Sequence, residues 1–262
     1  MNYQNATQRE YNQGYFANGF PNGRASAATV VYDNKMFVFG GTSTQTLLDN
    51  SVLIYDFVKN NWTVLSYTET DVVPRARYDH TATLYNGKAY IVGGYWPIPL
   101  RKFPKQTNDF ILFLLTIFWF TAPTGTPPHL VPRHPDFFND IWEFDLTNLT
   151  WTEVRPVSLA APTPRAGHST VLYNNQLYVF GGESYDLCAF NQSVRPANEC
   201  LTYTYDNDLW AFDLSALLWT EQSPAGPTPA ARMGHSAAIN SDGAYMLIYG
   251  GFDNSFLNDV NK

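Results

Sequence analysis

The stretch that decides the fold runs from Arg165 to Trp219. In one-letter code it opens with RAGH, continues to YVFGG at 178–182, then to NDLWAFDL at 207–214, and ends with a Trp. None of these short pieces is informative alone. Their value lies in the fixed order in which they recur elsewhere in the chain.

The same landmarks appear in three further copies, the last of them incomplete. Arg recurs at Arg24, Arg77 and Arg232, with His80 and His235 three residues after the last two and Ala27 in place of the first His. Gly pairs recur at Gly40-Gly41, Gly93-Gly94 and Gly250-Gly251. Asn recurs at Asn50, Asn139 and Asn258, followed in the first two copies by Asp56 and Asp145, and then by Trp62 and Trp151.

The repeat length is nearly constant once one variable segment is set aside. Between the Gly pair and the Asn lie 8, 44, 24 and 6 residues in the four copies. Without them the Arg-to-Arg spacings become 45, 44 and 43 residues. A constant frame with insertions at one place indicates a repeat architecture whose loops collect on one face.

This pattern resembles the kelch repeat, over about residues 24 to 262. The resemblance implies an all-β fold, a kelch-type β-propeller of four-stranded antiparallel blades, here with three full blades and part of a fourth. The expected blades are 24–76, 77–164, 165–231 and 232–262, with inserts at 95–138 and 183–206. Residues 1–20 are either a polar, disordered lead-in or a strand left from a preceding blade, and the propeller fragment itself spans 21–262.

Each blade should contain a strand after the His and a second strand that stops at the Gly pair. In the third copy these are 169–173 and 176–180. The third and fourth strands follow the Asn and begin at the Trp, at 209–214 and 219–222. Pro-rich segments such as 161–164 cannot join a sheet ladder fully and should link one blade to the next.

The repeated residues are predicted to hold the blades together rather than to catalyse a reaction, since each should do the same work in every blade. This structural set is Arg77, His80, Gly93, Gly94, Asp145, Trp151, Arg165, His168, Gly181, Gly182, Asp213, Trp219, Arg232, His235, Gly250 and Gly251. No catalytic residue is assigned. A metal site from His129 and His134 with Asp136 and Asp140 fits no familiar ligand spacing, so we expect neither metal nor cofactor.

Binding is instead expected on the face that gathers both inserts and the Pro-rich links. Its candidate contact residues are Tyr95, Trp96, Arg101, Tyr185, Tyr203 and Tyr205.

The segment 110–120, FILFLLTIFWF, breaks the repeat pattern. It is too short to span a bilayer as a helix. It fits a membrane or partner anchor, a buried plug across the propeller mouth, or sequence from a mis-assigned exon or retained intron. We favour the last of these over membrane contact.

Composition excludes one class of partner. The net charge is −7 and charged residues make up 15% of the chain. Duplex nucleic acid would require a basic stripe, and the sequence has none, so no nucleic-acid partner is expected. Cys188 and Cys200, in one insert, could equally be a disulfide or two thiols.

The sequence therefore predicts a non-catalytic kelch scaffold for an unidentified protein partner. The alternatives are a ligand-binding or enzymatic propeller, oxidase or lectin-like, and an incomplete gene-model fragment without independent function. The first 20 residues lack the apolar core of a signal peptide, so the compartment stays open, with the cytoplasm slightly favoured. The last repeat stops early, so we also expect an open arc with an unpaired, self-associating blade edge.

Overall fold

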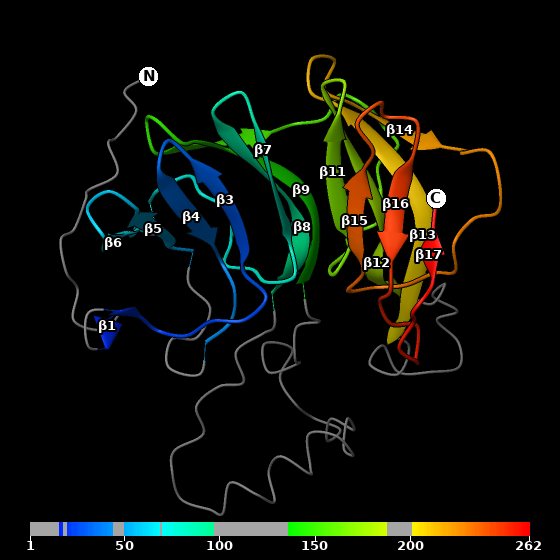
Figure 1. The fold of residues 1–262 in the computed structure, drawn as a ribbon, viewed down its shortest axis with the longest axis horizontal. Coiled ribbons are helices and arrows are strands. Elements are labelled where there is room, and N and C mark those ends of the chain that lie inside the picture. The colour runs from blue at the N-terminus through cyan, green and yellow to red at the C-terminus, as the bar shows by residue number, and fades with distance from the viewer. Residues whose placement is uncertain (1–15, 18–19, 44–49, 69, 97–135, 188–200) are drawn as a thin grey trace, which may run out of the picture.

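The computed structural model describes residues 16–17, 20–43, 50–68, 70–96, 136–187 and 201–262. All secondary-structure elements assigned among these residues are β-strands, and they form antiparallel sheets (Figure 1). No helix among the described residues is long and apolar enough to cross a bilayer.

Four sheets form the blades, and each strand pairs with the next one along the chain. Blade 1 contains β3 (Ala28–Tyr32), β4 (Lys35–Phe39), β5 (Val52–Asp56) and β6 (Asn61–Leu65). Blade 2 contains β7 (Thr81–Tyr85), β8 (Lys88–Trp96), β9 (Asp136–Asp145) and β10 (Thr150–Val154). Blade 3 contains β11 (Ser169–Tyr173), β12 (Gln176–Leu187), β13 (Leu201–Asp213) and β14 (Leu218–Gln222). Blade 4 contains β15 (Ser236–Ile239), β16 (Met246–Tyr249) and β17 (Val260–Asn261).

The predicted fold class, a kelch-type β-propeller with three full blades and part of a fourth, is confirmed. The first strands of successive blades, β3, β7, β11 and β15, lie next to one another in chain order around a common axis (Figure 1). A short hairpin of β1 (Phe16–Ala17) and β2 (Phe20–Pro21) precedes blade 1.

In blades 1 to 3 the first two strands are joined by a two-residue turn in which both residues have positive φ angles. Asn86 and Gly87 supply them at 49° and 72°, and Asn174 and Asn175 at 45° and 64°. Asn and Gly tolerate this left-handed conformation better than other residues, which is why they occupy these turns.

The prediction that the second strand ends at the Gly pair is wrong for blades 2 and 3. There β8 and β12 continue past the pair, and β9 and β13 begin early to match them. The pairing register shifts at the pair, between Val92 and Gly94 and between Phe180 and Gly182, as in a β-bulge. The predicted inserts 95–138 and 183–206 therefore begin and end as paired strands that lengthen both hairpins.

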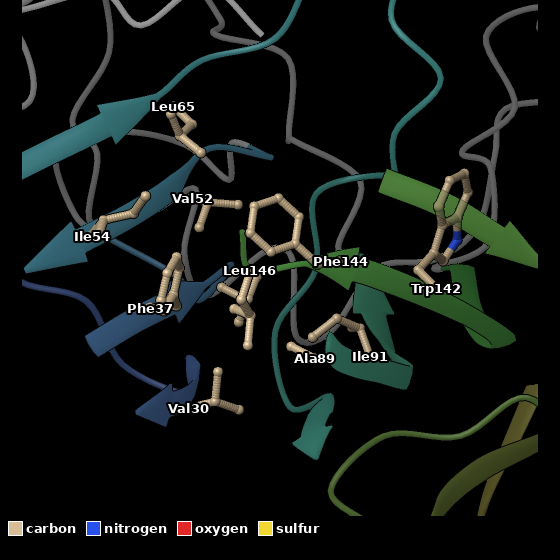
Figure 2. Close-up of a cluster of buried hydrophobic side chains, with 11 residues drawn as sticks. Val30, Phe37, Val52, Ile54, Leu65, Ala89, Ile91, Trp142, Phe144 and Leu146 are labelled. Atoms are coloured by element: carbon tan, nitrogen blue, oxygen red, sulfur yellow. The ribbon is translucent and has the colours of Figure 1, made fainter. Parts of the chain in front are cut away.

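Apolar side chains fill the space between adjacent blades. Figure 2 shows Phe37, Val52 and Leu65 of blade 1 facing Ile91 and Phe144 of blade 2. The rings of Phe37 and Phe144 meet edge to face, with centroids 6.2 Å apart. Blade 2 packs on blade 3 in the same way, through Ile141 against Trp210 and Phe212. Burial of these faces stabilises the side-by-side arrangement of the blades.

Several predicted features lie outside the described residues. They are residues 1–15 of the lead-in, Arg101, the segment 110–120, His129, His134, Cys188 and Cys200.

Candidate binding site

In blades 2 to 4 the repeated Arg is buried and binds both a backbone carbonyl and a carboxylate through its guanidinium. Arg165 donates through Nη1 to the Gly181 carbonyl at 2.9 Å, and through Nη1 and Nη2 to the Asp208 carboxylate at 2.7 and 2.8 Å. Arg77 binds Asp140, and Arg232 binds Asp259, in the same two-pronged manner. Sequence reasoning noticed the Asn-Asp pair but did not identify this Asp as the partner of Arg.

The Gly pair sits where two blades touch. A Cβ on Gly181 would lie 2.8 Å from the Arg232 carbonyl oxygen and 3.1 Å from the His235 ring of the next blade. A Cβ on Gly182 would lie 3.0 Å from Cβ of His168 in its own blade. Both residues also have positive φ, 63° and 108°. Glycine is therefore required at this contact for space as well as for conformation.

The repeated Asp and Trp organise the outer half of blades 1 to 3. Asp213 accepts the backbone N–H groups of Ser215 and Ala216 with one carboxylate oxygen, both at 2.8 Å, which fixes the tight turn before the last strand. Trp219 then packs against Phe212, with ring centroids 5.0 Å apart. The repeated residues named so far thus make their contacts within and between blades.

The repeated His residues are held neutral by burial. Burial, with the nearby Arg77, lowers the pKa of His80 to about 3, and burial, with Arg165, lowers that of His168 to about 3. Burial and Arg232 lower the pKa of His235 to about 4. A neutral imidazole in each blade interface is a packing group at physiological pH.

A belt of backbone hydrogen bonds runs around the axis, close to these His residues. It uses the residue directly before the His position: Ser26, Asp79, Gly167 and Gly234 in the four blades. All four have φ between 53° and 65°. Asp79 donates to Ser26, Gly167 to Asp79, and Gly234 to Gly167, at 3.1, 2.8 and 2.8 Å. The left-handed conformation turns each N–H toward the preceding blade.

Beside this belt the propeller face opens into a hollow of about 250 Å³. We call it the axial hollow. Its lining residues are Tyr78, Asp79, Tyr95, Phe137, Ala166, Glu183, Tyr203 and Met233. Most of them occupy one of three positions of the repeat. Two of these positions lie between the repeated Arg and His, and the third directly follows the Gly pair. These are the places where the copies differ, while the surrounding frame repeats.

An aromatic row forms one wall of the axial hollow. Tyr95 contacts Tyr78 and Phe137, with ring centroids 5.0 and 4.8 Å apart, and Phe137 lies 6.2 Å from Tyr203. Tyr95 and Phe137 come from the blade 2 hairpin, and Tyr203 from the blade 3 hairpin. The two elongated hairpins therefore meet on one face and leave the propeller at the same end (Figure 1).

Two carboxylates face the same hollow. Burial, together with the charge of Asp79, raises the pKa of Glu183. Burial also raises the pKa of Tyr78, and Tyr95, Asp79 and Glu183 add to that shift. In the described part of the chain neither Asp79 nor Glu183 forms an ion pair. The hollow thus combines aromatic side chains with two carboxylates that form no ion pair with a cation of the described residues.

Of the predicted contact residues, the structure brings Tyr95 and Tyr203 into the axial hollow. Trp96 lies at the end of β8, under the guanidinium of Arg75 at 4.5 Å from the ring centroid. Tyr205 contacts Phe252 of blade 4, with ring centroids 6.2 Å apart. Tyr185 pairs through its backbone with Tyr203. Sequence reasoning missed Tyr78, Asp79, Phe137, Glu183 and Met233, although their place beside the repeated residues could have identified most of them.

The described residues contain no group of three or more His, Cys, Asp or Glu that could hold a metal ion. Asp140, once considered beside His129 and His134, is bound by Arg77.

Comparison with known proteins places these features in a family. The KLHDC2/KLHL20/DRC7 Kelch-repeats domain matches residues 3–136 and 132–262. Kelch domain-containing protein 3 from Bos taurus is 24% identical over 252 residues, which cover 87% of this chain and 61% of that protein. Tip elongation aberrant protein 3 from Schizosaccharomyces pombe is 29% identical over 212 residues, covering 78% of this chain and 16% of that protein.

The leucine-zipper-like transcriptional regulator 1 homolog from Drosophila melanogaster is 24% identical over 90% of this chain and 25% of its own length. This chain thus spans between about a sixth and three fifths of the length of these relatives. Relatives built of kelch repeats suggest a protein-interaction scaffold in general and are typically non-enzymatic. With a repeat frame, blade geometry and family match in agreement, the chain belongs to the kelch-repeat β-propeller family.

Proposed function

We propose that this chain is a non-catalytic protein-interaction scaffold that binds its partner on one face of the propeller. We define that surface, the hairpin face, by the axial hollow together with Trp96 and Tyr205 at its rim. The two elongated hairpins, β8–β9 and β12–β13, frame it.

The observation that carries this proposal is the division of work between repeated and variable residues. The repeated Arg, His, Gly, Asp and Trp contact other parts of the propeller. The side chains that differ from blade to blade line the axial hollow instead. A surface that presents a different side chain from each blade, on a rigid frame, can recognise one partner among many.

Aromatic residues at the hairpin face fit this use. Tyr and Trp are enriched at protein interfaces because they bury a large area and keep a polar group for hydrogen bonding. Tyr203 has 48% of its surface exposed and stands at the entrance of the hollow. The pairs of charged residues within the blades, such as Arg165 with Asp208, are engaged in folding contacts, which supports a binding rather than a catalytic use.

The test compares aromatic truncations at two places on the surface, where Tyr203 and Phe57 are similarly exposed, at 48% and 50%. Tyr203→Ala, combined with Tyr95→Ala, alters the hairpin face. Phe57→Ala is the matched control, because Phe57 is 50% exposed and follows β5 at the opposite end of its blade. Each immobilised protein captures partners from an extract of the source cells, and quantitative mass spectrometry compares the three.

We expect proteins that the unaltered chain and Phe57→Ala retain equally, and that the double variant loses by at least about tenfold, as when central aromatic contacts are removed. Thermal unfolding checks that the variants are folded. Equal retention by the double variant would place the contact surface elsewhere and overturn the proposal.

A further inference from the structure

We propose that the axial hollow binds a cationic side chain of the partner, and that arginine is the side chain it fits. This inference rests on the proposed function, since it names the chemistry that the hairpin face recognises. Two carboxylates without an ion pair among the described residues, the aromatic wall and the conformation of one residue each support it.

The first argument is charge. Asp79 and Glu183 both line the hollow. Burial, and after it the charge of Asp79, raises the pKa of Glu183. Among the described residues, the eight that line the hollow include these two acids and no Lys or Arg. A cation entering from a partner would relieve the repulsion between the carboxylates and could donate hydrogen bonds to both.

The second argument is shape and surface. Tyr78, Tyr95 and Tyr203 line the same hollow as the carboxylates, and the rings of Tyr78 and Tyr95 are in contact. A cation above such a ring, within about 6 Å of its centroid, is attracted by the π electrons. A guanidinium is planar, so it can stack on a tyrosine ring and still present its N–H donors to two carboxylates at its edge. A lysine ammonium carries the charge but has no planar group that could stack on the ring.

The third argument is the place of Asp79 in the backbone belt. Its φ is 53°, a left-handed conformation in which blades 3 and 4 place Gly167 and Gly234. Non-glycine residues are disfavoured there, although Asp is better tolerated than most. Asp79 places a carboxylate in the hollow at this position, where the equivalent residues of blades 3 and 4 have no side chain. We therefore assign the Asp79 carboxylate a role in ligand binding and not in folding.

The experiment uses labelled peptides of the form Gly-Ser-Xaa-Ser-Gly, in which Xaa is Arg, Lys, Gln or Glu. Fluorescence anisotropy and saturation-transfer NMR measure their binding to the full chain at low and at 0.5 M salt. The variants are Glu183→Gln and Asp79→Asn, which remove a charge and retain the shape. Glu221→Gln is the control, because it removes one negative charge from an exposed position on the outermost strand β14.

We expect the Arg peptide to bind more tightly than the Lys peptide, and the Gln and Glu peptides to bind at least about tenfold more weakly than Arg, since they offer no cation for the carboxylates. Either hollow variant should weaken Arg binding by about tenfold, and Glu221→Gln by less than about twofold, because exposed charges contribute little. High salt should weaken binding by the unaltered chain.

Equal binding of the Arg and Gln peptides, or full Arg binding by both hollow variants, would overturn the inference. Tighter binding of Lys than Arg would retain a cation site and overturn its assignment to arginine. The capture experiment distinguishes failure of the cation site from failure of the hairpin face as the binding surface. If proteins still depend on Tyr95 and Tyr203 while Arg peptides fail to bind, only the cation site is lost; if that dependence also fails, the proposed hairpin face is lost with it.

Discussion

Arg165 and Asp208 form a two-pronged ion pair in which the guanidinium is almost fully enclosed and the carboxylate is partly open to solvent. The side chains are 2% and 27% exposed. Burial opposes ionisation of Asp208, but the hydrogen bonds and the charge of Arg165, with a hydrogen bond from Trp210, together outweigh it and lower the pKa of this carboxyl. The pair fastens the link between blades 2 and 3 to the third strand of blade 3.

Replacement of this partner should destabilise the fold strongly. Asp208→Asn retains the shape of the side chain but leaves a buried guanidinium without its main counter-ion, since Asp206 lies farther away at 3.6 Å. We expect a loss of about 3 kcal/mol in the free energy of unfolding, measured by urea titration. Glu153→Gln, in the exposed pair with Arg155, is the control and should cost less than about 1 kcal/mol. Similar losses for the two variants would mean that the buried pair contributes no more to the free energy of unfolding than the exposed pair does.

Gly181 and Gly234 allow the cost of the left-handed conformation to be separated from the cost of a steric clash. Gly181 and Gly234 have nearly the same φ, 63° and 65°, but nothing lies within 4 Å of a Cβ on Gly234. Gly234→Ala should therefore cost only the left-handed conformation, about 1–2 kcal/mol. Gly181→Ala should cost that amount and more, because the new methyl meets the Arg232 carbonyl and the His235 ring. Urea unfolding of both variants measures the difference, and equal losses would show that the blades can separate slightly without cost.

Because the imidazoles are buried, we expect the free energy of unfolding to fall in mild acid, at pH values above those at which carboxylates usually take up protons. Their folded-state pKa values, about 3 for His80 and His168, lie below the usual value of 6.5. Below pH 6.5 the unfolded chain binds protons that the folded chain does not, so stability falls as the pH drops toward 3. Each imidazole contributes a slope of up to about 1.4 kcal/mol per pH unit in this window.

Urea unfolding between pH 7 and pH 4 measures that slope. The variant His168→Gln should show a smaller slope than the unaltered chain, whatever its stability at pH 7. An unchanged slope would show that His168 takes up a proton in the folded state.

The frame of the fold could be predicted from the sequence because it repeats. The turns, the strands that follow the His, and those that begin at the Trp occur near the predicted positions, since each depends on local residues such as Asn174, Asp213 and Trp219. The continuation of β8 and β12 past the Gly pair could not be predicted. It depends on pairing between the two ends of a long insert, which are far apart in sequence and have no repeated signal.

The site was only partly predictable for a related reason. Repetition identifies residues with the same role in each blade, whereas Tyr78, Asp79 and Glu183 matter because they differ from their equivalents. Only the assembled blades show that these scattered positions surround one hollow. Tyr95 and Tyr203 could be predicted because the hairpin topology alone brings the two inserts to one end.

Asp79 supplies a last prediction, on the relation between stability and binding. Asp79→Gly places at this position of the belt the residue that blades 3 and 4 already have. It removes a side chain from a left-handed conformation and relieves the repulsion of Glu183, so we expect a gain of about 0.5–1 kcal/mol in the free energy of unfolding. Thermal and urea unfolding should both detect it. The effect on Glu183 is a second readout, because loss of the neighbouring charge should lower its pKa, measurable by NMR titration.

The matched control is Asp33→Gly, at a residue that also has a positive φ, 45°, but lies in the β3–β4 turn away from the hollow. Both variants relieve backbone strain, whereas only Asp79→Gly should shift the titration of Glu183 and weaken binding of the Arg peptide. A more stable protein with weaker binding would mean that Asp79 is retained at the expense of folding stability. A less stable Asp79→Gly protein would instead assign the carboxylate a role in the belt itself, and would remove one of the three arguments for the cation site.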